Sequence, residues 1–208
     1  MKKALWCTLL VVLSSLAVAS GPSVVPMNQL KMQGIGRQTL DYSCGAAALS
    51  ILLSNYYKIE ISEMDVLFDM VLRKNSEDIK IVMNEGFSIY DLKEAVERLG
   101  FSASGIILDV NSAAKLNGPV ILLFRNKLAN HFVVLRGISQ GRVFITDPAL
   151  GHYRLPLHEL EKKWKGETLV VERTGFDLPA NGEFGIPSGK SVASERDVVR
   201  ALKNKPLN

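Results

Sequence analysis

The chain is poor in cysteine, histidine and net charge, and each shortage excludes a class of protein. Its 208 residues include only two cysteines and three histidines, too few for a disulfide framework and without the closely spaced ligand pairs of a zinc site. The formal net charge is +4, and no run of lysine and arginine suggests a surface that follows nucleic-acid phosphates. Apolar residues still make up 47% of the chain, a globular composition. We therefore expect a folded protein that binds no nucleic acid, no metal and no other cofactor.

Long hydrophobic runs are also scarce, and the one that exists lies at the N-terminus. Lys2-Lys3 precedes an uncharged, mostly apolar run over residues 4–18, which is shorter than the roughly 20 residues of a membrane-spanning helix. Ala17-Val18-Ala19 then forms the small-x-small pattern after which signal peptidase cuts. We interpret residues 1–19 as a signal peptide, with an uncleaved anchor as the alternative. Cleavage would remove Cys7 and leave a periplasmic protein without an integral membrane span.

The first half of the remaining chain has helical periodicity. Residues 20–37 are polar and are interpreted as a loose lead-in. A helix that begins at Cys44 places five apolar side chains on one face: Leu49, Leu52, Leu53, Tyr56 and Tyr57. Two more helices are expected over about 62–73 and 88–99, because each range begins with the serine and aspartate spacing of a capping box: Ser62 with Asp65, and Ser88 with Asp91.

After Gly100 the pattern changes to short apolar or β-branched runs separated by turn-forming residues. These runs predict strands over 104–110, 120–124, 132–137 and 143–146, and two more near 152–155 and 168–172 around a helix near 157–164. Helices followed by strands indicate an α+β domain, with N-terminal helices packed on an antiparallel β-sheet, over residues 20–173. Residues 174–208 are rich in glycine and proline and are expected to form a flexible tail. Its short charged helix near 194–203 fits either a docking tail or a frayed terminus.

Cys44 stands where the first long helix begins, and this position suits a nucleophile. The helix dipole and the free amides of the first turn favour the thiolate over the thiol. Gly45 is expected to leave room for a substrate beside the backbone. Gln38, six residues upstream, is within reach to place its side-chain NH2 group beside the sulfur. A lone cysteine next to alanines also fits core packing, so position alone does not decide between the two.

The histidines point to a partner for this cysteine. His131 opens one strand-like run and Asp147 closes the next, and a turn around residues 139–141 would make the two strands antiparallel neighbours. We therefore expect His131 and Asp147 to be adjacent, with the aspartate holding the imidazole in the tautomer that a cysteine nucleophile needs. Structural roles for both residues are the alternative. His152 fits an exposed strand position, and His158 fits a surface helix.

Together, three sequence blocks resemble the C39 family of cysteine peptidases, the bacteriocin-processing type. The blocks are Gln38-x-x-x-x-x-Cys44-Gly45-Ala46-Ala47, His131-Phe-Val-Val-Leu135 and Asp147-Pro-Ala-Leu-Gly151. The likeness covers roughly residues 32–172 and includes the segments 86–101 and 157–166. The resemblance implies a papain-like α+β fold and four site residues: Cys44 as nucleophile, His131 as base, Asp147 as its orienting partner and Gln38 as an oxyanion-hole donor.

The chain also departs from the best-known members of that family. Those members are N-terminal domains of peptide-exporting ABC transporters, which cut leader peptides after a Gly-Gly or Gly-Ala pair. This sequence contains no transporter or nucleotide-binding domain, and Ser43 stands before the cysteine where an acidic residue is common in the family. It looks more like the stand-alone secreted C39 proteins that accompany functional-amyloid export systems.

We therefore expect a periplasmic cysteine peptidase that cleaves a peptide bond by a Cys-His-Asp mechanism and processes an exported peptide or an amyloid-type substrate. Its partners would be that peptide or protein and a component of an export system or of the outer membrane. One alternative is a non-catalytic module that holds an export substrate in the same cleft, which the joint presence of Cys44, His131 and Asp147 disfavours. Another is a different papain-like acyl-transfer enzyme such as a cell-wall amidase, which the upstream Gln38 and the Asp147-Pro148 turn disfavour.

Overall fold

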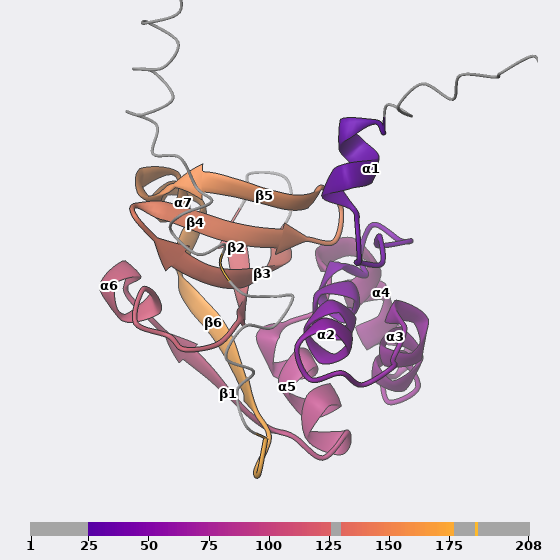
Figure 1. Ribbon diagram of the computed structural model, residues 1–208. Coiled ribbons are helices and arrows are strands. Elements are labelled where there is room, and N and C mark those ends of the chain that lie inside the picture. Colours follow the sequence, from indigo (N-terminus) through magenta and orange to yellow (C-terminus); the bar gives the residue numbers. More distant parts are fainter. Residues whose placement is uncertain (1–24, 126–129, 177–185, 187–208) are drawn as a thin grey trace, which may run out of the picture.

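The computed structural model describes residues 25–125, 130–176 and 186. Within these ranges five helices precede the first strand, in line with the predicted order, and two short helices lie between strands (Figure 1). The elements are α1 (Met27–Lys31), α2 (Cys44–Asn55), α3 (Glu63–Val71), α4 (Ser76–Glu85), α5 (Ile89–Arg98), β1 (Ser102–Ile107), α6 (Val110–Ala113), β2 (Val120–Arg125), β3 (Asn130–Ser139), β4 (Arg142–Asp147), β5 (Gly151–Pro156), α7 (Leu157–Lys163) and β6 (Trp164–Glu172). Among the described helices, none combines the length and apolar character needed to cross a bilayer. The predicted signal peptide lies outside the described residues, as does the predicted tail from residue 177 onward, apart from residue 186.

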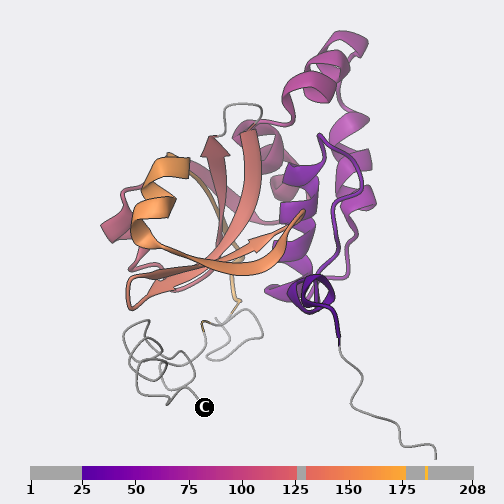
Figure 2. The same ribbon diagram turned by 90° about the horizontal axis from the view of Figure 1, so that it is seen from above.

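The six strands form one antiparallel sheet in the order β1-β6-β2-β3-β4-β5. Helices α2 and α5 cover one face, and the sheet curls around α7 on the other (Figure 2). Strand β2 contributes to both cores, because Ile121 and Leu123 face α2 whereas Leu122 and Phe124 belong to the cluster around α7. Burial on both faces explains why this strand is a continuous apolar run rather than an alternating one.

Two of the predicted helix starts are confirmed in atomic detail. In α3, the Ser62 hydroxyl accepts the Asp65 amide and the Asp65 carboxylate accepts the Ser62 amide. In α5, Ser88 and Asp91 make the same reciprocal pair. Each capping box satisfies amides that would otherwise lack a partner at the start of the helix.

Three of the described helices were not predicted from the sequence: α1, α4 and the short α6, which begins at Val110 where a strand was expected to end. Helix α1 lies in the lead-in that was expected to be irregular, and it buries none of its residues. Helix α4 carries Ile79, Val82 and Met83 at helical spacing, although only Val82 is buried, so this apolar stripe could have predicted the helix. A second signal lies at its start, where the Asn75 side chain accepts hydrogen bonds from the amides of Glu77 and Asp78.

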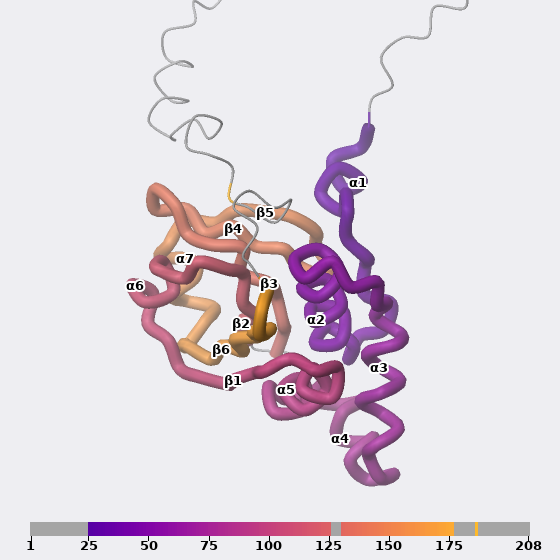
Figure 3. The backbone as a smooth tube through the Cα atoms, turned by 60° about the horizontal axis from the view of Figure 1, so that its bottom comes forward, coloured from indigo at the N-terminus to yellow at the C-terminus, as the bar shows by residue number. Residues whose placement is uncertain are grey.

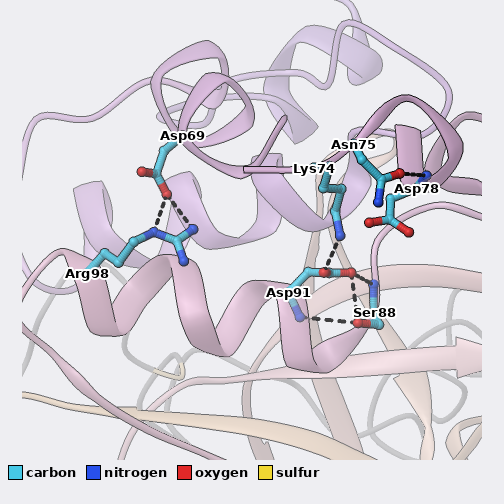
Figure 4. Close-up of polar contacts among 7 residues, drawn as sticks. All are labelled: Asp69, Lys74, Asn75, Asp78, Ser88, Asp91 and Arg98. Carbon is cyan, nitrogen blue, oxygen red and sulfur yellow. Dashed lines mark hydrogen bonds and ion pairs between the residues drawn. The ribbon is translucent and has the colours of Figure 1, made fainter. Parts of the chain in front are cut away.

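Polar contacts join the outer helices α3 and α4 to α5 (Figure 4). Arg98 on α5 binds the Asp69 carboxylate on α3, with Nη2 2.6 Å from Oδ2. Lys74, just before α4, lies 2.6 Å from Asp91, which also caps α5. Burial by itself would raise the pKa of Asp91, but its hydrogen bonds to Lys74 and Ser88 lower it. Helix α3 packs against α2 on the side away from the sheet, and α4 follows α3 at the outside of the helical layer (Figure 3).

The hairpin between β3 and β4 brings the two predicted site strands together. Gln140 and Gly141 form a two-residue loop between the paired residues Ser139 and Arg142, with φ angles of 50° and 71°. Positive φ at both loop positions is typical of a tight hairpin turn. Because the pairing is antiparallel, the start of β3 and the end of β4 lie side by side at the open end of the hairpin, as predicted.

Candidate active site

Three elements meet at the open end of this hairpin and bring the predicted residues together. Cys44 is the first residue of α2, His131 lies near the start of β3, and Asp147 ends β4. The His131 Nε2 atom is 2.9 Å from Asp147 Oδ1, and the Cys44 side chain is hydrogen-bonded to the same imidazole. Since Nε2 faces the carboxylate, Nδ1 is the ring nitrogen left for the sulfur. Cys44 is 4% exposed, so its side chain is almost fully enclosed by protein.

The close packing of α2 on β3 depends on Gly45. A Cβ atom at this position would lie 2.8 Å from Leu92 Cδ1 and 3.2 Å from Phe132 Cδ2. The expectation that Gly45 leaves space for a substrate is therefore wrong, because core side chains fill that space. The glycine instead allows the first turn of α2 to approach β3, which places Cys44 next to His131.

Asp147 is held by the turn that follows it. Its Oδ1 atom accepts the backbone N–H groups of Ala149 and Leu150 at 2.8 and 3.1 Å, in addition to the His131 ring. The Tyr153 hydroxyl donates to Oδ2 at 3.5 Å. Burial by itself would raise the pKa of Asp147, but the hydrogen bond and charge of His131, followed by the two backbone N–H groups, lower it. The residue is thus a fixed carboxylate that points at the imidazole.

His131 is held between two acceptors. Burial by itself would lower its pKa, but the hydrogen bonds and charges of Asp147 and Cys44 outweigh burial and raise the pKa to about 9. The imidazole is therefore protonated at neutral pH. An imidazolium beside a cysteine stabilises the thiolate and carries a proton that a leaving amine can accept.

The backbone of Gln38 joins the turn after Asp147, and its side chain already uses one amide hydrogen within its own loop. Its backbone N–H donates to the carbonyl of Pro148, the residue after Asp147, at 3.0 Å. Its side-chain Nε2 donates to the Leu40 carbonyl at 3.2 Å, and its buried Oε1 has no hydrogen-bond partner in the structure. Because a side-chain amide carries two N–H donors, the contact with Leu40 uses one of them.

Sequence reasoning missed Tyr153 and misplaced His152. Tyr153 contacts Asp147 because β5 pairs with β4, a relation that the alternation along β5 could have indicated. His152 was expected to be exposed, but its Nδ1 pairs with the Thr146 hydroxyl at 2.8 Å and its Nε2 with the Gln33 carbonyl at 3.2 Å. Burial lowers its pKa, so it is a neutral structural residue. His158 lies exposed on α7, as expected.

The chain is similar to known proteases over most of its described length. The family model of the peptidase C39 family matches residues 33–175. A Pseudomonas aeruginosa protein described as a probable functional amyloid protease, FapD, is 34% identical over 154 residues, which cover 74% of this chain and 67% of that protein. A Pseudomonas fluorescens protein with the same description is 28% identical over 184 residues, which cover 88% and 80% of the two chains.

Solved structures give the same fold. A double glycine motif protease from an AMS/PCAT transporter, solved in complex with the leader peptide, has a TM-score of 0.55 and 27% identity and covers 67% of this chain and 91% of its own. The peptidase domain of Streptococcus ComA has a TM-score of 0.56 and 20% identity and covers 67% and 97%. These neighbours confirm the predicted papain-like α+β fold with helices on an antiparallel sheet.

Proposed function

This chain belongs to the peptidase C39 family of cysteine peptidases, and from that premise we propose that Cys44 is its nucleophile and His131 its general acid and base, oriented by Asp147. The observation that carries the assignment is the continuous hydrogen-bonded series from Cys44 through His131 to Asp147. A cysteine activated by an imidazole, which a carboxylate orients, is the arrangement that nucleophilic acyl transfer requires.

The geometry supports a two-step mechanism. The Cys44 thiolate attacks the carbonyl carbon of a peptide bond. The resulting oxyanion accepts hydrogen bonds from the backbone N–H of Cys44 and from the second side-chain N–H of Gln38. His131 gives its proton to the leaving amine, the carbon–nitrogen bond breaks and a thioester remains. Water then gives a proton to His131 and attacks the thioester, which releases the new carboxyl end and restores the thiolate.

The descriptions of the relatives support a class of substrate. Two relatives are described as probable functional amyloid proteases, and a solved neighbour is a double glycine motif protease bound to a leader peptide. We propose that this protein cleaves an exported peptide or an amyloid-type precursor, in association with an export system. The signal-peptide pattern of residues 1–19 supports the proposal that this cleavage takes place in the periplasm.

A comparison with Cys44→Ala tests the proposed chemistry. The purified protein is incubated with a proteome-derived peptide library, and new peptide ends are identified by mass spectrometry. We expect a defined set of cleavages by the wild type and none by Cys44→Ala, because only the chemical step needs the sulfur. If both proteins yield the same products, Cys44 is not the nucleophile. If neither protein cleaves but both retain the same library peptides, the site binds peptides without cleaving them, and the proposed catalytic roles of Cys44, His131 and Asp147 are wrong.

A further inference from the structure

We propose that Glu63, the first residue of α3, is a positioning residue for this reaction because its carboxylate holds the loop between Gln38 and Cys44. The inference rests on the proposed function, since it concerns how the oxyanion donor and the nucleophile are kept in register. Glu63 itself touches neither the sulfur nor the imidazole in any contact that the structure records.

The carboxylate binds both ends of this loop. The Thr39 backbone N–H, directly after Gln38, donates to the two Glu63 oxygens at 3.0 and 3.1 Å. The Ser43 hydroxyl, directly before Cys44, is in close hydrogen-bond contact with Glu63 Oε1. Hydrogen bonds to an ionised acceptor are roughly twice as strong as those between neutral groups, so a single carboxylate fixes both loop ends.

The same contacts continue to the side chain of Gln38. The Ser43 oxygen accepts the Leu40 amide at 3.2 Å and lies 2.8 Å from the Leu40 carbonyl. That carbonyl accepts Gln38 Nε2 at 3.2 Å. Glu63 is therefore connected, through Ser43 and Leu40, to the amide group that is proposed to hold the oxyanion. Ser43 is fully buried, so its hydroxyl depends on these partners.

The start of α3 does not require this carboxylate for its own capping. Ser62 and Asp65 form the capping box, in which Asp65 accepts both the amide and the hydroxyl of Ser62. Asp65 therefore offers a matched control, an acidic residue in the same helical turn that stabilises α3 without contact to the loop. The residue before the proposed nucleophile, Ser43, has no charge of its own, and the Glu63 carboxylate from α3 is in hydrogen-bond contact with its hydroxyl.

Misplacement of a catalytic group by about 1 Å can cost about 10²-fold in rate. We therefore expect Glu63→Gln to lower kcat about 10- to 100-fold on a peptide that the wild type cleaves, with KM changed less than about threefold. Asp65→Asn should lower thermal stability at least as much and leave kcat within about twofold. Ser43→Ala should reduce kcat to a similar extent, and the double variant should be no slower than the slower single variant, because both act through one set of contacts.

Hydrogen exchange tests the anchoring separately from catalysis. In Glu63→Gln, amides of residues 39–43 should exchange at least about fivefold faster than in the wild type, whereas Asp65→Asn should leave them unchanged. A Glu63→Gln protein with wild-type kcat, or with wild-type exchange over this loop, would overturn the proposal. So would a loss of kcat that Asp65→Asn reproduces. If the wild type shows no cleavage that depends on Cys44, the proposed function fails, and the exchange measurement still decides whether Glu63 holds the loop.

Discussion

At the scale of single residues, Asp147 links the end of β4 to the imidazole of His131. Its Oδ1 atom accepts two backbone N–H groups as well as the His131 ring, so the orientation of the imidazole depends on the turn after β4. An amide at this position can keep the backbone contacts through its oxygen but cannot stabilise a charged imidazole. The proposed mechanism therefore predicts that the negative charge of Asp147, rather than the shape of its side chain, supports the reaction.

We expect Asp147→Asn to fold normally and to lower kcat by roughly 10²- to 10⁴-fold, because His131 loses the charge that orients it. Steady-state kinetics on a cleaved peptide measure the effect, with circular dichroism to confirm the fold. Tyr153→Phe is the control, since it removes only the long contact to the other carboxylate oxygen and should cost less than about tenfold. Equal losses in both variants would contradict a special role for the charge.

The charge of His131 also makes stability depend on pH. Folding raises its pKa from 6.5 to about 9, so the folded state binds this proton more tightly than the unfolded state. The stabilisation is complete below about pH 6.5 and is lost as the pH rises through about 9. We expect the difference in free energy of unfolding between wild type and His131→Gln to fall over this window. Urea unfolding at pH 6, 7.5 and 9.5 measures it, and a difference independent of pH would show that His131 carries no stabilised proton.

At the scale of elements, the approach of α2 to β3 sets the site. Gly45→Ala introduces a methyl group against Leu92 and Phe132. We expect a loss of about 1–3 kcal/mol in the free energy of unfolding from overpacking, together with reduced activity because the start of α2 moves away from His131. Gly36→Ala is the control, since a Cβ there meets no atom within 4 Å. Urea denaturation of both variants provides the measurement, and equal stability would mean that α2 can shift without cost.

At this scale, the sequence predicted the features whose residues lie close together along the chain. The capping boxes of α3 and α5 each lie within four residues, and the hairpin that aligns His131 with Asp147 closes through a two-residue turn. The meeting of Cys44 with this hairpin requires the packing of α2 on β3, which no local pattern encodes. It was expected from the chemistry that a cysteine nucleophile needs and from a family resemblance. Glu63 has no distinguishing signal, since an acidic residue suits the first turn of any helix.

At the scale of the whole molecule, the sequence predicts a processed protein. We expect the mature chain to begin near Ser20, after the Ala17-Val18-Ala19 pattern, and to contain Cys44 as its one titratable thiol. Intact mass measurement of the protein recovered from the periplasm, with thiol counting under denaturing conditions, tests both points. A mass that includes residues 1–19, or a second thiol, would support the retained anchor instead.

The packing of the helical layer on one face of the sheet has a consequence for how the site is assembled. The proposed nucleophile belongs to the helical layer, whereas the proposed base and its aspartate belong to the β3–β4 hairpin. Neither layer contains all three proposed catalytic residues, so the proposed cysteine–histidine pair exists only while the two layers remain packed together. Activity would therefore depend on an interface inside the domain, and its loss would indicate that the helical layer has separated from the sheet.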